Sequence, residues 1–164
     1  MKEILFFDIA GMGTVIYSNI ESKYYIYRSK EEKKLAALKL INAESVVSFN
    51  GKHKYRFGSL NYDYKMLKAA LDDEEPIFKG EHEDMMDSLC QNNKYPAFWS
   101  QSLSAVYQKV FHISDEELWR IHERMDVGIN HVFFDVFQTF RIWEALHSGL
   151  VDEIHPYWYS LISD

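Results

Sequence analysis

An aspartate interrupts the most apolar stretch near the start of the chain, where Ile4–Ile9 reads ILFFDI. A lone carboxylate buried among apolar side chains costs several kcal/mol unless it is paired or binds a cation. Asp8 also stands just before Gly11 and Gly13, which mark a tight turn and the end of a strand. Asp8 is therefore a candidate cation ligand, and the alternative is an aspartate that caps the turn.

Two further aspartates occur in settings that suit the same chemistry. His131 and Asp135 are four residues apart on one face of an expected helix whose flanking side chains are apolar, so the acid needs a compensating partner. The alternative for this pair is a solvent-facing polar stripe. Asp63 begins an expected helix after the loop that follows an apolar strand, where the ordinary explanation is a helix cap.

Short stretches rich in β-branched and aromatic residues predict the strands that would position these acids. The first three follow each other closely and predict an antiparallel meander, and a fourth ends at Asn50-Gly51. The predicted strands are Glu3–Ile9, Thr14–Ile20, Lys23–Arg28, Ser45–Phe49 and Ile77–His82.

Helical spacing of apolar residues and two S-x-x-E capping boxes, at Ser29 and Ser114, predict the helices. Gly149 stands where a glycine commonly ends a helix. The segment Lys52–Asn61 predicts a loop or a small hairpin. The predicted helices are Glu31–Asn42, Tyr62–Leu71, Asp84–Gln91, Ser102–Phe111, a helix from Ser114 to about Met125, and Asn130–His147. Strands and helices mixed in this way predict an α/β sheet flanked by helices.

Composition limits the classes of protein that the chain can belong to. Its 164 residues, 47% of them apolar, fit one domain with a continuous core, and its single cysteine, Cys90, excludes an internal disulfide and favours a cytoplasmic location. The sequence has no run of about 18 apolar residues, so it predicts no membrane span. A net charge of −7 argues against a broad basic surface that reads DNA. It does not argue against a nuclease whose acidic site is neutralised by bound cations.

Several motifs are each degenerate, but their order and spacing along the chain are more specific than any one of them. They are FFDIAGMG around Asp8, VVSFNG followed by YDYKML with Asp63 and Leu67, HEDMMDSL with Asp84, SLSAVYQKVFHIS, and NHVFFDVFQT with Asp135 and Thr139. In this order the chain resembles the DEDD (DnaQ-like) superfamily of 3′–5′ exonucleases over about Ile4–Leu146. The resemblance implies a single exonuclease domain over residues 1–164, with the mixed sheet of an RNase H-like fold.

The resemblance also implies a mechanism with two Mg²⁺ or Mn²⁺ ions about 3.5–4 Å apart. Asp8 would bridge both ions, and Asp63 and Asp135 would each support one of them. One ion would activate a water with the help of a general base, and the other would stabilise the leaving 3′ oxygen. His131 is the preferred base because a histidine can take a proton near neutral pH, and Asn130 is the second candidate for that position.

The sequence departs from the family pattern at the D-x-E pair, whose glutamate position is Ala10. The loss of this carboxylate leaves two hypotheses. One is a 3′–5′ exonuclease acting on single-stranded DNA or RNA ends, in a form inactivated naturally or by deliberate replacement. The other is a catalytically impaired RNase H-fold module that binds nucleic acid or a protein partner.

The stretch of about ten extra residues, Lys52–Asn61, is the second departure, and it is basic and polar. Lys52, His53, Lys54 and Arg56, with Asn50 before them, could hold phosphates of a substrate strand; the alternative is a solvated charge run. Tyr62 or Phe57 could stack on a terminal base. The aromatic run Tyr95–Trp99 could stack in the same way or close a homodimer surface.

Overall fold

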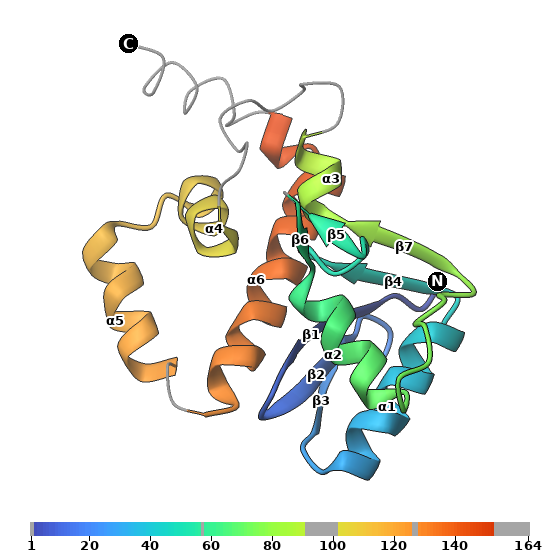
Figure 1. Ribbon diagram of the computed structural model, residues 1–164. Coiled ribbons are helices and arrows are strands. Elements are labelled where there is room, and N and C mark those ends of the chain that lie inside the picture. The colour runs from blue at the N-terminus through green and yellow to red at the C-terminus, as the bar shows by residue number, and fades with distance from the viewer. Residues whose placement is uncertain (1, 57, 91–101, 126–127, 153–164) are drawn as a thin grey trace.

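The structure is a computed structural model that describes residues 2–56, 58–90, 102–125 and 128–152 (Figure 1). Phe57 and Tyr95–Trp99, considered above as stacking or dimer residues, lie outside the described residues. Within the described ranges, no helix combines the length and apolar character needed to cross a membrane.

A five-stranded mixed sheet forms the centre of the molecule, in the order β3-β2-β1-β4-β7. The first three strands pair antiparallel as the predicted meander, with Phe6 opposite Tyr17. β4 then joins β1 in parallel, and β7 joins β4 in parallel. The strands are β1 Leu5–Ala10, β2 Gly13–Ser18, β3 Lys23–Tyr27, β4 Ser45–Ser48 and β7 Glu81–Asp84.

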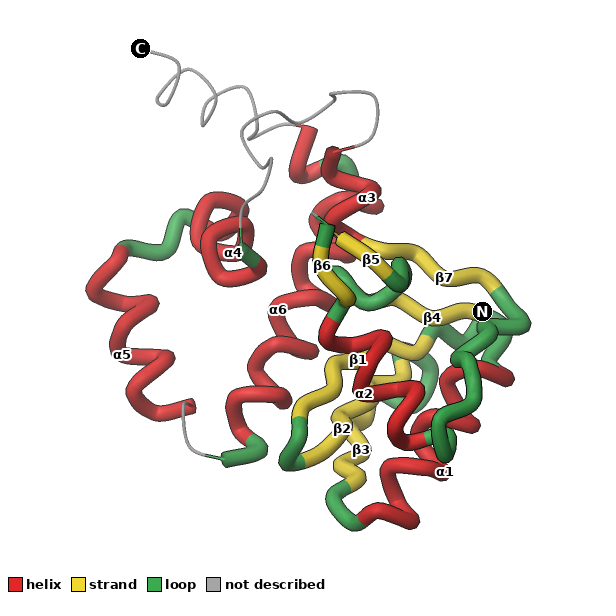
Figure 2. The backbone as a smooth tube through the Cα atoms, in the orientation of Figure 1, coloured by secondary structure: helices red, strands yellow, loops and turns green. Residues whose placement is uncertain are grey.

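Helices flank both faces of this sheet, and a small two-stranded hairpin precedes the second helix (Figure 2). The predicted capping box at Ser29 forms, because its hydroxyl accepts from the Glu32 amide at 3.1 Å and the Glu32 carboxylate accepts from the Ser29 amide at 3.0 Å. These elements are α1 Lys30–Asn42, β5 Tyr55–Arg56, β6 Ser59–Leu60, α2 Tyr62–Ala70, α3 Met85–Cys90, α4 Leu103–Phe111, α5 Asp115–Met125 and α6 Asn130–His147.

The fifth strand of the sheet begins later than predicted, at Glu81 rather than Ile77. Gly80 passes so close to the end of α1 that a Cβ atom there would lie 2.3 Å from the carbonyl oxygens of Ala43 and Glu44. Only beyond this corner can the chain pair with β4. The helix predicted over Asp84–Gln91 forms as a helix over Met85–Cys90, and Asp84 just before it is the last residue of β7, opposite Ser48.

Alternation along β1 divides the core into two layers. Leu5, Phe7 and Ile9 pack with residues of α1 and α2 on one face of the sheet. Phe6 packs with residues of α4 and α6 on the other face, and Ala10 lies against the same cluster. Because successive side chains of a strand point to opposite faces, Asp8 shares the α6 side with Phe6 and Ala10.

Candidate carboxylate metal centre

The three predicted aspartates line one cavity of about 360 Å³. Asp8 comes from the carboxyl-terminal half of β1, Asp63 from the first turn of α2 and Asp135 from the second turn of α6. Figure 1 shows β1 between these two helices. The described residues of the wall are Asp8, Phe49, Asn50, Arg56, Ser59, Leu60, Asn61, Tyr62, Asp63, Leu103, Asp135 and Thr139.

The carboxylates raise each other's proton affinity. Burial raises the pKa of Asp8 well above its usual range, and the charges of Asp63 and Asp135 and a hydrogen bond with the Asp135 carboxyl raise it further. Burial raises the pKa of Asp63 to about 7, with added effects from Asp135 and Asp84. Close carboxylates of this kind hold a proton between them or bind a cation in its place. Their oxygens are the hard ligands that Mg²⁺ and Mn²⁺ prefer.

The alternative explanations for these acids do not fit the structure. Asn61, not Asp63, is the N-cap of α2, because its Oδ1 accepts from the Asp63 amide at 3.2 Å. Asp8 lies within the β1–β2 ladder, opposite Val15, and not in the turn. The side chain of Asp135 is only 21% exposed and forms part of the cavity wall, so it does not belong to a solvent-facing stripe.

The two candidates for the general base lie at the start of α6. His131 Nε2 is 3.5 Å from Asp135 Oδ2, and the histidine side chain is 47% exposed. Asn130 is the first residue of α6 and is also exposed. Neither belongs to the described wall of the cavity. The spacing therefore keeps His131 beside the third carboxylate, and its role as a base stays a prediction.

Ala10 is the last residue of β1, where it pairs with Gly13. It is partly buried and lies two residues beyond Asp8 on the same side of the strand. The position that the resemblance assigns to a glutamate therefore offers only a methyl group. The candidate cation ligands are therefore Asp8, Asp63 and Asp135.

The predicted substrate residues separate into two groups. Asn50, Arg56 and Tyr62 line the cavity. Lys52 and Lys54 are exposed and do not belong to its described wall. The Lys54 ammonium lies 3.8 Å from Glu75 Oε1. Phosphate binding by these residues stays a prediction, with the cavity-lining group better placed for it.

Arg56 is already bound within the protein. Its guanidinium donates from Nη1 to Asp87 Oδ1 at 2.8 Å and from Nη2 to Asp84 Oδ2 at 3.0 Å. Its Nε donates to Asn50 Oδ1 at 2.9 Å. The β5–β6 hairpin is therefore attached to β7 and α3 across the edge of the cavity.

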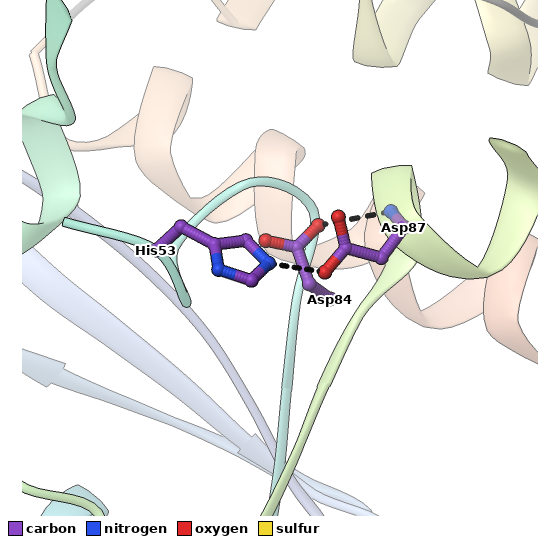
Figure 3. A group of neighbouring side chains, drawn as sticks. All are labelled: His53, Asp84 and Asp87. Atoms are coloured by element: carbon purple, nitrogen blue, oxygen red, sulfur yellow. Dashed lines mark hydrogen bonds and ion pairs between the residues drawn. The ribbon is translucent and has the colours of Figure 1, made fainter. Parts of the chain in front are cut away.

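His53, Asp84 and Asp87 form a second group that could hold a cation (Figure 3). The Asp84 side chain is fully buried, and its Oδ1 accepts from the amides of Met86 and Asp87, at 3.0 and 3.4 Å. Its Oδ2 accepts from the Lys52 amide and from Arg56. Asp87 also pairs with His53. Since protein donors already occupy these oxygens and Arg56 supplies positive charge, the group is structural.

Replacing Arg56 with methionine should therefore lower the free energy of unfolding by about 1–3 kcal/mol, because a buried carboxylate loses a charged donor. Urea denaturation measures the change. Lys54→Met is the matched control, since its exposed ion pair contributes less than about 1 kcal/mol. Equal losses in the two variants would contradict the structural role of Arg56.

No protein-family model, curated protein or solved structure matches this chain. The function must therefore be inferred from the side chains that the fold brings together.

Proposed function

We propose that the protein is a divalent-cation-dependent 3′–5′ exonuclease that acts on single-stranded DNA or RNA ends. The observation that carries this proposal is the meeting of Asp8, Asp63 and Asp135 in one cavity, from a strand and two helices far apart in the sequence. They are the three acids that the resemblance assigns to the metal ions.

The architecture supports an RNase H-like fold. An antiparallel meander supplies the first three strands, two parallel strands extend the sheet beside β1, and the helix α6 packs against β1. This strand order is compatible with that fold. It brings the carboxyl end of the central strand next to the helix that carries the third aspartate.

The donor set fits Mg²⁺ or Mn²⁺, and Asp8, Asp63 and Asp135 would hold the ions. When bound, such ions neutralise phosphate charge and activate a water molecule. Among the chain's own groups, His131 lies beside Asp135 and is the candidate general base. Leu60 and Tyr62, 47% and 53% exposed, offer an apolar surface at the cavity against which a terminal base can stack.

Ala10 favours a second candidate function, a catalytically impaired module that binds nucleic acid or a partner protein. In this case the cavity would still bind a cation and a strand end, because Asp8, Asp63 and Asp135 remain. Hydrolysis would be slow, since the fourth carboxylate of the family pattern is missing. The cytoplasmic location and the homodimer stay predictions.

Incubation of 3′- and 5′-labelled single-stranded oligonucleotides with the protein, with Mn²⁺ or with EDTA, tests the first proposal. We expect stepwise shortening from the 3′ end in Mn²⁺ only, and loss of this activity in Asp8→Asn. Asp73→Asn is the matched control, because Asp73 is exposed, lies away from the cavity and has a φ of 67°, which asparagine tolerates.

The melting temperature in Mn²⁺ separates the remaining explanations. A rise with Mn²⁺ and retention of oligonucleotides without cleavage would support the impaired module. A melting temperature that Mn²⁺ leaves unchanged, together with no cleavage, would contradict both functions. It would leave a domain whose three aspartates have structural roles only.

A further inference from the structure

A short turn, Phe49–Gly51, lies between the carboxylate cavity and a buried polar pair beneath it. Ser48, at the end of β4, is fully buried, and His82 on β7 is 8% exposed. Ser48 Oγ lies 2.8 Å from His82 Nε2 and accepts a hydrogen bond from the Gly51 amide at 3.0 Å. The turn is therefore linked to the interior of the sheet.

Hydrogen bonds from three other parts of the chain hold the same turn. The Met86 amide donates to the Phe49 carbonyl at 3.1 Å. Asn61 Nδ2 donates to the Asn50 carbonyl at 2.6 Å, and Arg56 Nε donates to the Asn50 side chain at 2.9 Å. Because hydrogen bonds hold the Phe49 carbonyl, the Asn50 carbonyl and side chain, and the Gly51 amide, the turn is a fixed surface and not an adaptable loop.

Gly51 is the point at which this surface touches the candidate site. A Cβ atom on Gly51 would lie 3.0 Å from Asp63 Oδ2 and 3.0 Å from Ser48 Oγ. Both distances are shorter than ordinary van der Waals contact, so an added methyl group would displace the carboxylate, the hydroxyl or both. Because glycine has only a hydrogen atom at this position, the Asp63 carboxylate has room beside it.

Ser48 and His82 act as support and not as reacting groups. Burial, together with the charges of Lys52 and His53, lowers the pKa of His82 to about 3, so the imidazole is neutral at physiological pH. Ser48 is inaccessible to a substrate. Within the described residues His82 Nδ1 has no hydrogen-bond partner, so the ring's polar contact is the one to Ser48.

We propose that Gly51, supported from below by Ser48 and His82, is a positioning residue that sets the Asp63 carboxylate in the geometry for cation binding. The proposal rests on the proposed cation site. It adds that this geometry depends on Ser48 of β4 and His82 of β7, neither of which is among the described residues that line the cavity.

Gly51→Ala tests the proposal, with Gly11→Ala as the matched control. A Cβ atom on Gly11 would meet nothing within 4 Å, although the Gly11 amide donates to the hydroxyl of Tyr62, which lines the cavity, at 3.1 Å. We expect Gly51→Ala to weaken Mn²⁺ binding about tenfold or more in calorimetric titration, as is typical when groups that orient metal ligands are changed. Gly11→Ala should bind Mn²⁺ with an affinity within about twofold of that of the unchanged protein, because it changes no group that orients a metal ligand.

The support beneath the turn is tested by comparing His82→Gln with His82→Leu. Glutamine can place an amide nitrogen near the position of Nε2 and bond Ser48, whereas leucine cannot. We expect Mn²⁺ affinity to be largely kept in His82→Gln and lost in His82→Leu and Ser48→Ala. Urea denaturation in EDTA shows whether each variant is folded at the titration temperature.

The outcomes separate the two proposals. If the unchanged protein binds Mn²⁺ and Gly51→Ala binds it equally well, the positioning role is overturned and the proposed function stays intact. If Gly51→Ala fails to fold, Ser48→Ala decides, and wild-type affinity in that variant overturns the proposal. No Mn²⁺ binding by the unchanged protein would overturn the cation site and the positioning role together.

Discussion

Ala10→Glu is expected to increase the rate of Mn²⁺-dependent oligonucleotide hydrolysis by about 100- to 1,000-fold, the range typical of a single group that stabilises charge in a transition state. Ala10 ends β1 two residues beyond Asp8 and on the same side of the strand. A longer acidic side chain there can reach the carboxylate cavity. Product lengths on a sequencing gel give the rate and the direction of hydrolysis.

Ala10→Gln is the control for this gain, because glutamine has nearly the same shape without the charge. Adding Asp135→Ala to Ala10→Glu should abolish the activity again, since a ligand on α6 is then missing. Full activity in the double variant would mean that Asp135 is not a ligand. A folded Ala10→Glu protein without activity would argue against the exonuclease and in favour of the binding module.

In the absence of metal ions, Asp63 is expected to make the protein less stable as the pH rises from about 4 to about 7, by roughly 2–4 kcal/mol. Burial, Asp135 and Asp84 raise the pKa of Asp63 to about 7 in the folded chain. Between the unfolded and folded pKa values the folded chain binds more protons than the unfolded chain. Its stability therefore falls with rising pH through this window, and Mn²⁺ should restore it.

Urea denaturation of the unchanged protein and of Asp63→Asn, at about pH 5 and pH 8 in EDTA, isolates this effect. The comparison between variants is needed because His82, whose pKa burial lowers to about 3, changes stability in the opposite direction as the pH falls. Asp63→Asn should be more stable than the unchanged protein at pH 8 and gain nothing from Mn²⁺. An equal pH dependence in both proteins would contradict the buried carboxylate cluster.

Local rules were enough to predict the elements that carry the acids. The meander follows from β-branched and aromatic runs separated by turns, and α6 begins and ends at the predicted residues, Asn130 and His147. Both faces of β1 are apolar because helices cover both of them, which made Asp8 conspicuous in the sequence. A single acid in an otherwise apolar strand is therefore a residue that the sequence alone marks as a candidate ligand.

The parts that sequence did not predict depend on contacts between distant residues. Ile77 and Phe78 are apolar and suggested the start of a strand, but Ile77 is 72% exposed and the pairing with β4 begins only after Gly80. The basic run suggested phosphate contacts, whereas Arg56 binds acids 28 and 31 residues away. The Ser48–His82 pair joins two strands through residues that are 34 positions apart. No local pattern predicts such pairs.

The carboxylate cavity has walls from both the N-terminal strand and α6, and this has a consequence during protein synthesis. A chain still attached to the ribosome has Asp8 and Asp63 outside long before residue 135 emerges, and these two acids alone do not complete the site. If the cavity cuts nucleic acid, the ability to cut arises only when translation of this region is finished. In that case the messenger and ribosomal RNA beside the growing chain are protected, because the segment that carries Asp135 is synthesised after those that carry Asp8 and Asp63.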